Sequence, residues 1–516
     1  MKSFLRKNRI FLITLAIFLV LFALAQQGMG AKDFLITTLR GFSVGSVTFL
    51  VAAGFSLIFG LLDVLNLAQG TLYMLGAYIG WTVYVRPDTF VDLLTPLALI
   101  LCGFTLAAFW KWLFGRISFS EKVQRFLPWV LMAVGVILFA LILPKYPVAI
   151  WNLDNYAQSP VSYAFNADQL ARLPVFPAVF EEIAPGTALT GLVLGSLLFA
   201  AGLALFGWNP TSQTRLKMQD FIPFALVLAF GLAAFFFNNT ATQLLLGMDT
   251  TWLFVIALAV SVIAGAGLGA LIETVLIRPL YSRPIYQLML TIGLSYVGIQ
   301  VVQAIWGRNE FTMPTPSLFR AAPGVTCPST SLAGWFQDHC STILVLDGRV
   351  RMYDEVFIPI VGILVLVAVW LLLKRTRLGM IIRAGVQDRQ MVEALGINVR
   401  RIFTLVFALG VGLATFGGTL AAPSTGLSNA MGESLLLSAL IALAIGGLTS
   451  YPGAALGALL LGLIQQFVIK YGQIGIPIPF TENLFKPSPT LVPASTVLLM
   501  IIVLLIFPTG LLGKKE

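Results

Sequence analysis

The sequence predicts an all-α protein, a polytopic transmembrane helical bundle. Residues of the apolar set make up 58% of the chain and charged residues only 10%, whereas a soluble domain carries about 25% charged residues. The apolar runs give about 12–14 hydrophobic segments, most near the 20-residue length of a bilayer crossing. A chain of 516 residues with this composition cannot cover a globular surface in water, so one membrane domain with loops is the simpler account.

Fourteen candidate segments follow one another along the chain, and several are short enough to be broken or re-entrant helices. They cover residues 10–26, 36–60, 64–85, 93–113, 126–143, 187–207, 221–237, 252–276, 286–306, 357–373, 402–421, 435–449, 453–470 and 494–509.

The N-terminal segment, residues 1–35, permits two interpretations. A basic start, an apolar run and the small-residue pattern Ala23-Leu24-Ala25 fit a cleaved secretory signal, and a retained first span fits as well. We favour the retained span, with the N-terminus in the cytoplasm and the chain emerging outside near Gln27.

The basic residues agree with strict alternation across a cell membrane. The net charge is +10, and most of the 32 Lys and Arg fall in segments that alternation assigns to the cytoplasm, as the positive-inside rule requires. The long polar stretches 144–186 and 307–356 fall outside, and the C-terminus falls inside. This distribution argues for a multi-pass protein of the inner, cytoplasmic membrane and against a nucleic-acid partner.

Few residues here are suited to metal or redox chemistry. Cys327 and Cys340 lie 13 positions apart in the second external stretch, where an oxidising exterior favours a disulfide that stabilises the loop by about 3 kcal/mol. Two free thiols are the alternative. Cys102 is expected to be a plain buried residue. With one histidine, His339, we expect no metal site, no cofactor and no catalytic residue.

The internal loop 374–401 carries the clearest functional signal. The stretch from Asp388 to Leu395 has an acidic start and helix-favouring residues, and Gly396 follows as a C-cap. This predicts a short cytoplasmic helix with apolar side chains beside charged ones. Such a helix can dock into a groove on a soluble partner, and an interfacial helix lying on lipid is equally compatible with the residues.

Five stretches in a fixed order carry a family resemblance. They are 60–78 (GLLDVLNLAQGTLYMLGAY), 272–280 (IETVLIRPL) with 291–295 (TIGLS), the loop stretches 383–388 (RAGVQD) and 394–398 (ALGIN), 446–457 (GGLTSYPGAALG) and 507–511 (FPTGL). Together they span most of residues 36–512. On these stretches the chain resembles the branched-chain amino acid ABC transporter permease family, a Liv-type inner-membrane permease.

The resemblance implies a transport subunit and not an enzyme. Such permeases work with two cytoplasmic ABC ATPase subunits, a second permease subunit and an extracytoplasmic solute-binding protein. In agreement, the sequence holds no Gly-x-x-x-x-Gly-Lys-Ser/Thr phosphate loop.

The resemblance also implies two sets of site residues. One is the ATPase coupling loop: Arg383, Gln387, Asp388, Met391, Glu393, Ala394, Leu395, Gly396 and Asn398. The other is a substrate path: Asn66, Gln69, Gly70, Thr71, Tyr73 and Gly76. These polar groups lie in an apolar region, where unpaired ones are costly, so they either line a path or satisfy one another at a helix break. We favour the path.

This sequence departs from the family at the predicted path. A His and a Glu are common where Gln69 and Thr71 stand, and a basic residue often stands at the position of Ser438. The loss of ionisable groups leaves the substrate open.

The chain is expected to comprise a core and an added block. Residues 36–85 form the first part of the permease core and 252–512 the second, and 86–251 form an inserted block with four extra hydrophobic segments and an external loop. Because four is even, later segments keep their sides of the membrane.

We therefore expect an ABC importer permease for branched-chain amino acids or a similar small polar solute, with urea or short amides as the alternative. An ion-coupled secondary transporter needs charges deep in its spans, whereas Asp63 and Glu273 lie near span ends, and an arginine such as Arg278 suffices to pair them. A membrane enzyme needs a catalytic constellation, which one external histidine does not provide.

Overall fold

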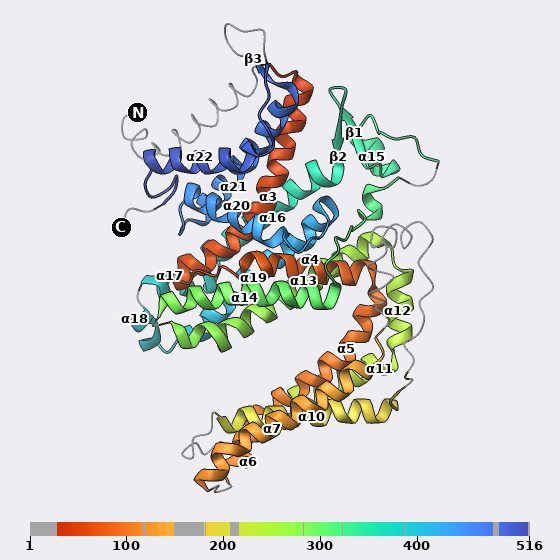
Figure 1. Ribbon diagram of the computed structural model, residues 1–516, viewed down its shortest axis with the longest axis vertical. Coiled ribbons are helices and arrows are strands. Elements are labelled where there is room, and N and C mark those ends of the chain that lie inside the picture. The colour runs from red at the N-terminus through yellow and green to blue at the C-terminus, as the bar shows by residue number, and fades with distance from the viewer. Residues whose placement is uncertain are drawn as a thin grey trace. The chain divides into compact units, whose positions relative to one another are not determined.

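A computed structural model of the protein describes residues 28–116, 120–148, 180, 182–206, 216–281, 283–321, 324–387, 389–477 and 484–513. Within these ranges the chain is mostly helical (Figure 1), and ten helical stretches are long and apolar enough to cross a membrane. The predicted polytopic helical bundle is thereby confirmed. Of the other four expected segments, 10–26 lies outside the described residues, and three are helices of 16 or 17 residues.

The chain divides into two compact units, residues Met1–Trp81 with Thr250–Glu516, and residues Thr82–Asp249. The bounds of the second unit nearly coincide with those of the predicted block, 86–251. That this block is an insertion into a permease core stays a prediction.

The first unit contains these elements: α3 (Ala31–Leu62), α4 (Gln69–Val85, which runs on into the second unit), α13 (Thr250–Ile272), η4 (Glu273–Ile277), η5 (Arg278–Leu280), α14 (Pro284–Trp306), η6 (Ser317–Phe319), α15 (Leu332–Asp338), β1 (Thr342–Val345), β2 (Gly348–Arg351), η7 (Met352–Phe357), α16 (Ile358–Arg375), α17 (Arg377–Gln387), α18 (Arg389–Ala394), α19 (Val399–Thr425), α20 (Met431–Gly446), α21 (Tyr451–Ile474), β3 (Ile476–Pro477), β4 (Leu484–Phe485) and α22 (Leu491–Ile506).

Two helices form the centre of the first unit. The apolar stretches of α3 and α19 are each 72% buried, more than any other candidate span described. Their small and aromatic side chains share one core with residues of α4, α20 and α21. That core consists of Val51, Ala52, Phe55, Tyr73, Ala414, Ala421, Ala439, Leu443 and Ala454.

Glycines set the spacing between the central helices and their neighbours. A Cβ added at Gly41 of α3 would lie 2.7 Å from a side-chain carbon of Leu463 in α21. One added at Gly265 of α13 would lie 2.1 Å from the Thr415 hydroxyl oxygen in α19. Because lipid provides no hydrophobic drive for helix association, such close backbone packing is a main source of stability in a membrane bundle.

The second unit contains α5 (Pro87–Cys102), η1 (Gly103–Leu106), α6 (Ala107–Phe114), α7 (Glu121–Ile142), η2 (Leu143–Lys145), α10 (Pro185–Phe206), η3 (Met218–Phe221), α11 (Ile222–Phe236) and α12 (Asn238–Gly247).

In the second unit α10 packs against α7 and α5, and α11 against α5. A short 3₁₀ turn follows α5 at Gly103, whose backbone N–H donates to the Ser196 hydroxyl at 2.9 Å. The start of α5 is polar and buried: the Arg86 guanidinium pairs with the Asp88 carboxylate at 2.8 Å. These charges compensate each other, as buried charges must.

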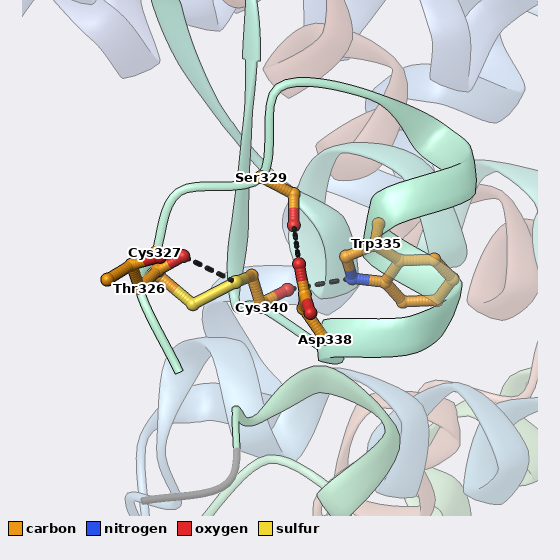
Figure 2. The surroundings of a disulfide bond; sticks show 6 residues. All are labelled: Thr326, Cys327, Ser329, Trp335, Asp338 and Cys340. Carbon is orange, nitrogen blue, oxygen red and sulfur yellow. Dashed lines mark hydrogen bonds between the residues drawn. A yellow bond between two sulfur atoms is a disulfide. The ribbon is translucent and has the colours of Figure 1, made fainter. Parts of the chain in front are cut away.

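A disulfide joins Cys327 to Cys340 in the stretch between α14 and η7 (Figure 2). The Trp335 indole N–H of α15 donates to the Cys340 carbonyl at 2.7 Å, and the Ser329 hydroxyl to the Asp338 carboxylate at 3.3 Å. The hairpin β1–β2 follows. Trp335 is buried, so this stretch has a small core of its own.

Candidate functional site

The segment between α3 and α4 interrupts two apolar helices. α3 ends at Leu62, and Asp63 takes a left-handed conformation with φ 54°. α4 begins only at Gln69. Non-helical backbone inside a membrane protein persists only where protein or trapped water supplies its hydrogen bonds.

Asn66 and Gln69 supply those bonds from within the segment. They are 1% and 0% exposed. The Asn66 side-chain oxygen accepts from the Ala68 backbone N–H at 3.2 Å, and its amide donates to the Gln69 side-chain oxygen at 3.1 Å. The Gln69 amide donates in turn to the Gly410 carbonyl of α19 at 2.7 Å. Gln69 therefore fastens the helix break to the central helix.

The next polar side chain, Thr71, contacts a different helix. Its hydroxyl lies 2.5 Å from the Ser295 hydroxyl of α14. On another side of α4, a Cβ added at Gly70 would lie 2.2 Å from the Gly432 carbonyl oxygen of α20. The start of α4 thus packs between α14 and α20.

Further along, α4 packs closely against α13 and α19. The Gly76 carbonyl accepts hydrogen bonds from the Ser261 hydroxyl of α13 at 3.2 Å and from the Thr419 hydroxyl of α19 at 2.8 Å. Tyr73 is 3% exposed, and a Cβ added at Gly418 would lie 2.0 Å from its backbone oxygen.

The structure thus places all six predicted path residues in one stretch: Asn66 in the segment before α4, and the other five on its first two turns. Asn66, Gln69 and Thr71 are buried and hydrogen-bonded to protein, the arrangement in which polar groups satisfy one another at a break. A role in lining a path stays a prediction.

The loop 374–401 contains one helix that the sequence did not predict. The expected helix from Asp388 to Leu395 corresponds to α18, but α17 precedes it. The residues that could have indicated α17 are the apolar Leu378, Ile381 and Ile382 with the small Gly385, which are spaced as on one face of a helix.

Gly396 ends α18 as expected. It has φ +80°, and its N–H donates to the Glu393 carbonyl at 3.0 Å, while the Ile397 N–H reaches the Val392 carbonyl at 3.3 Å. This pair of bonds is the Schellman motif. Asn398 then caps α19 by accepting from the Arg401 N–H at 3.3 Å.

The loop divides into a buried face and an exposed face. Val392 is 4% exposed and packs with Val399 and Phe403 of α19. Met391 and Leu395, in contrast, are 64% and 72% exposed.

The other predicted loop residues lie as follows. Arg383, Glu393, Ala394, Gly396 and Asn398 are exposed, and Arg383 also donates to the Leu373 carbonyl. Asp388 lies outside the described residues, as does the side chain of Gln387.

A buried carboxylate lies beside this loop, at the end of α13. Glu273 is 0% exposed and opens a π-helical turn, a feature frequent at functional sites. One of its oxygens accepts from the Tyr281 hydroxyl at 2.7 Å. The other accepts from Arg278 and from the Thr404 hydroxyl of α19, both at 2.7 Å.

Tyr281 links the Glu273 network to the loop 374–401. The Tyr281 ring packs edge-on against Phe403 at 6.0 Å between ring centroids and belongs to the cluster around Val392. The sequence analysis paired Glu273 with Arg278 but missed Thr404, which is 131 positions away.

Comparison with known proteins assigns this arrangement to a family. The sequence profile of a branched-chain amino acid transport system, permease component, matches residues 37–216 and 192–508. The chain belongs to this family. The permease resembles the protein LivH of Salmonella typhimurium, described as a high-affinity branched-chain amino acid transport system permease, with 28% identity over 54% of this chain and 81% of LivH. BraD of Pseudomonas aeruginosa, described in the same way, is 32% identical over 53% of this chain and 79% of BraD.

Similarity to other permeases is more limited. The fructose import permease FruF of Bifidobacterium longum is 28% identical over 22% of this chain and 35% of its own length. No solved structure matches.

In this permease α19 connects the loop 374–401 to the helix break. It begins beside Val392, contacts Glu273 through Thr404 and receives the Gln69 bond at Gly410. Further along, Thr419 bonds to Gly76 of α4. One continuous helix therefore touches both sets of predicted site residues.

Proposed function

We propose that this permease is the membrane-spanning subunit of an ABC importer in the cytoplasmic membrane, with both termini in the cytoplasm. Two ATPase subunits supply the energy, a second permease subunit completes the membrane part, and an extracytoplasmic binding protein delivers the solute. The family match over residues 37–508 carries the proposal. The preferred substrates are branched-chain amino acids, as in the names of LivH and BraD.

The exposed face of the cytoplasmic loop is the proposed contact with the ATPases. Met391 and Leu395 stand one helical turn apart and are mostly exposed, which is the spacing of an anchor pair in a helix-in-groove contact. Val392 holds the same helix against α19. A displacement of α18 by the ATPases is thus passed to α19 and on to Gln69.

Solute transport is tested with the purified complex in liposomes. With the binding protein outside and ATP within, we expect uptake of radiolabelled leucine that stops on ATP depletion and persists with an ionophore. Uptake that collapses with the ionophore instead would favour a secondary transporter. Urea and short amides are the competing substrates, because Gln69 and Thr71 carry no charge, and their uptake without that of leucine would establish this alternative.

ATPase docking is tested by co-purification. Met391→Ser with Leu395→Ser removes the proposed anchors, and Leu346→Ser is a matched control because Leu346 is 64% exposed in the external hairpin. We expect the paired substitutions to lose the ATPases and the control to retain them. Normal assembly and uptake in the paired variant would refute this contact.

A further inference from the structure

The outward face of α14 is unusual for a membrane span. Only 11% of its most apolar stretch is buried, the lowest value among the spans described in the first unit. The other described helices of the first unit therefore leave these residues uncovered.

A regular stripe runs along this face. It consists of Tyr286, Met289, Gly293, Tyr296 and Gln300, all exposed. The intervals alternate between three and four residues, the spacing with which one helix presents a continuous seam to another. We call these five residues the α14 seam.

The seam carries hydrogen-bonding groups into the middle of the span. Tyr296 is 66% exposed and lies near the centre of a 23-residue helix, with Gln300 one turn further along. Within the described part of the chain, neither side chain has a hydrogen-bond partner. Hydrocarbon tails offer none, and unsatisfied polar groups are costly there. A Cβ added at Gly293 would meet nothing within 4 Å, so another helix has room to approach closely.

α16 shows what a lipid-facing span of the same unit looks like. It too is poorly buried, at 17%. Its large exposed hydrophobic side chains are aliphatic: Ile360, Ile363, Leu364, Val367 and Leu371. The span of α16 is also the more hydrophobic of the two. α14 exposes aliphatic side chains as well, among them Ile292 and Val297, but it adds Tyr296 and Gln300, whose polar groups find partners on a protein surface and not in lipid.

We propose that the α14 seam is the contact surface for a transmembrane helix of the second permease subunit. This inference rests on the proposed function, which includes such a subunit. ATPases and a binding protein lie outside the bilayer, so of the proposed partners only a membrane-embedded one reaches Tyr296 and Gln300. Small and hydrogen-bonding side chains are the ones that hold membrane helices together.

The test is photo-cross-linking in the assembled transporter. A benzoylphenylalanine replaces Tyr296 in one variant and Leu364 in the matched control, since Leu364 is 62% exposed near the middle of its own span. We expect an adduct with the second permease subunit from position 296 and none from position 364.

The opposite outcomes are distinguishable. If the wild-type complex performs ATP-driven uptake but position 296 gives no such adduct, reacts within this chain or joins a second copy of it, the seam assignment is wrong. The same adduct from position 364 also refutes it. Loss of ATP-driven uptake in the wild type would instead contradict the proposed function.

A second pair of variants tests the close approach at Gly293. Gly293→Trp fills the open space in the seam, and Ala368→Trp places the same side chain on the exposed face of α16. We expect at least about a tenfold loss of second permease subunit on co-purification for Gly293→Trp, equivalent to about 1.4 kcal/mol. Ala368→Trp should retain it, and equal retention in both variants would refute the seam.

Discussion

The side-chain amide of Gln69 donates a hydrogen bond of 2.7 Å to the backbone carbonyl of Gly410. The two residues are 341 positions apart, and this bond joins the broken start of α4 to the continuous helix α19. The helix that follows the loop 374–401 therefore holds the buried polar segment in place, and substituting Gln69 tests that linkage.

Gln69→Leu should destabilise the isolated subunit. Leucine fits a similar volume but removes the bond to the Gly410 carbonyl and leaves the buried Asn66 amide without its acceptor, at a cost of about 1–3 kcal/mol. The melting temperature in detergent should fall by several degrees. Gln300→Leu is the control, because Gln300 is exposed and its substitution should leave the isolated subunit unchanged. Equal melting temperatures for both variants would contradict the assigned role of Gln69.

Glu273→Gln should weaken the junction between α13 and α19. The neutral amide no longer balances the Arg278 guanidinium. Breaking a fully buried pair costs about 3–5 kcal/mol, and the partial exposure of Arg278 makes the loss smaller here. Thermal unfolding of the purified subunit measures this loss. Thr274→Val, at the neighbouring exposed position, should change stability by no more than about 0.5 kcal/mol. If the Glu273 network does not stabilise the subunit, Glu273→Gln and Thr274→Val will give the same unfolding curve.

Gly396→Ala should disturb the loop 374–401 without unfolding the membrane part. A Cβ at φ +80° costs about 1–2 kcal/mol, and the end of α18 would shift. Gly385→Ala is the matched control, since the added carbon meets nothing within 4 Å and its backbone is helical. We expect ATPase co-purification to fall only for Gly396→Ala. Loss in both variants would point to a general effect of glycine replacement.

Cys327→Ser should loosen only the segment between α14 and η7. The closed loop is short, and opening it removes about 3 kcal/mol of stabilisation. Limited proteolysis should cut between α14 and η7 faster in the variant, while the helical circular dichroism stays unchanged. Cys102→Ser alters a buried free thiol in the second unit and should not change that cleavage. An unchanged rate for Cys327→Ser would mean that the segment around Trp335 is stable without its cross-link.

Hydropathy predicted most of the membrane helices because a span must be long and apolar whatever its neighbours are. The end of α18 was also predictable, since Gly396 acts through local backbone geometry. The partners of Gln69, Thr71 and Glu273 were not, because Gly410, Ser295 and Thr404 lie more than 100 positions away. No local pattern encodes which helices meet. α17 was not predicted because basic residues interrupt its apolar series.

The second unit holds four candidate spans among its described residues, and this parity bears on how such a chain can evolve. A gene that gains or loses the whole block in one event leaves α18 on the same side of the membrane as before. An odd number of crossings would reverse every later helix and carry Met391 and Leu395 away from the compartment that holds ATP. Viable length variants of this permease are therefore expected to differ by pairs of spans.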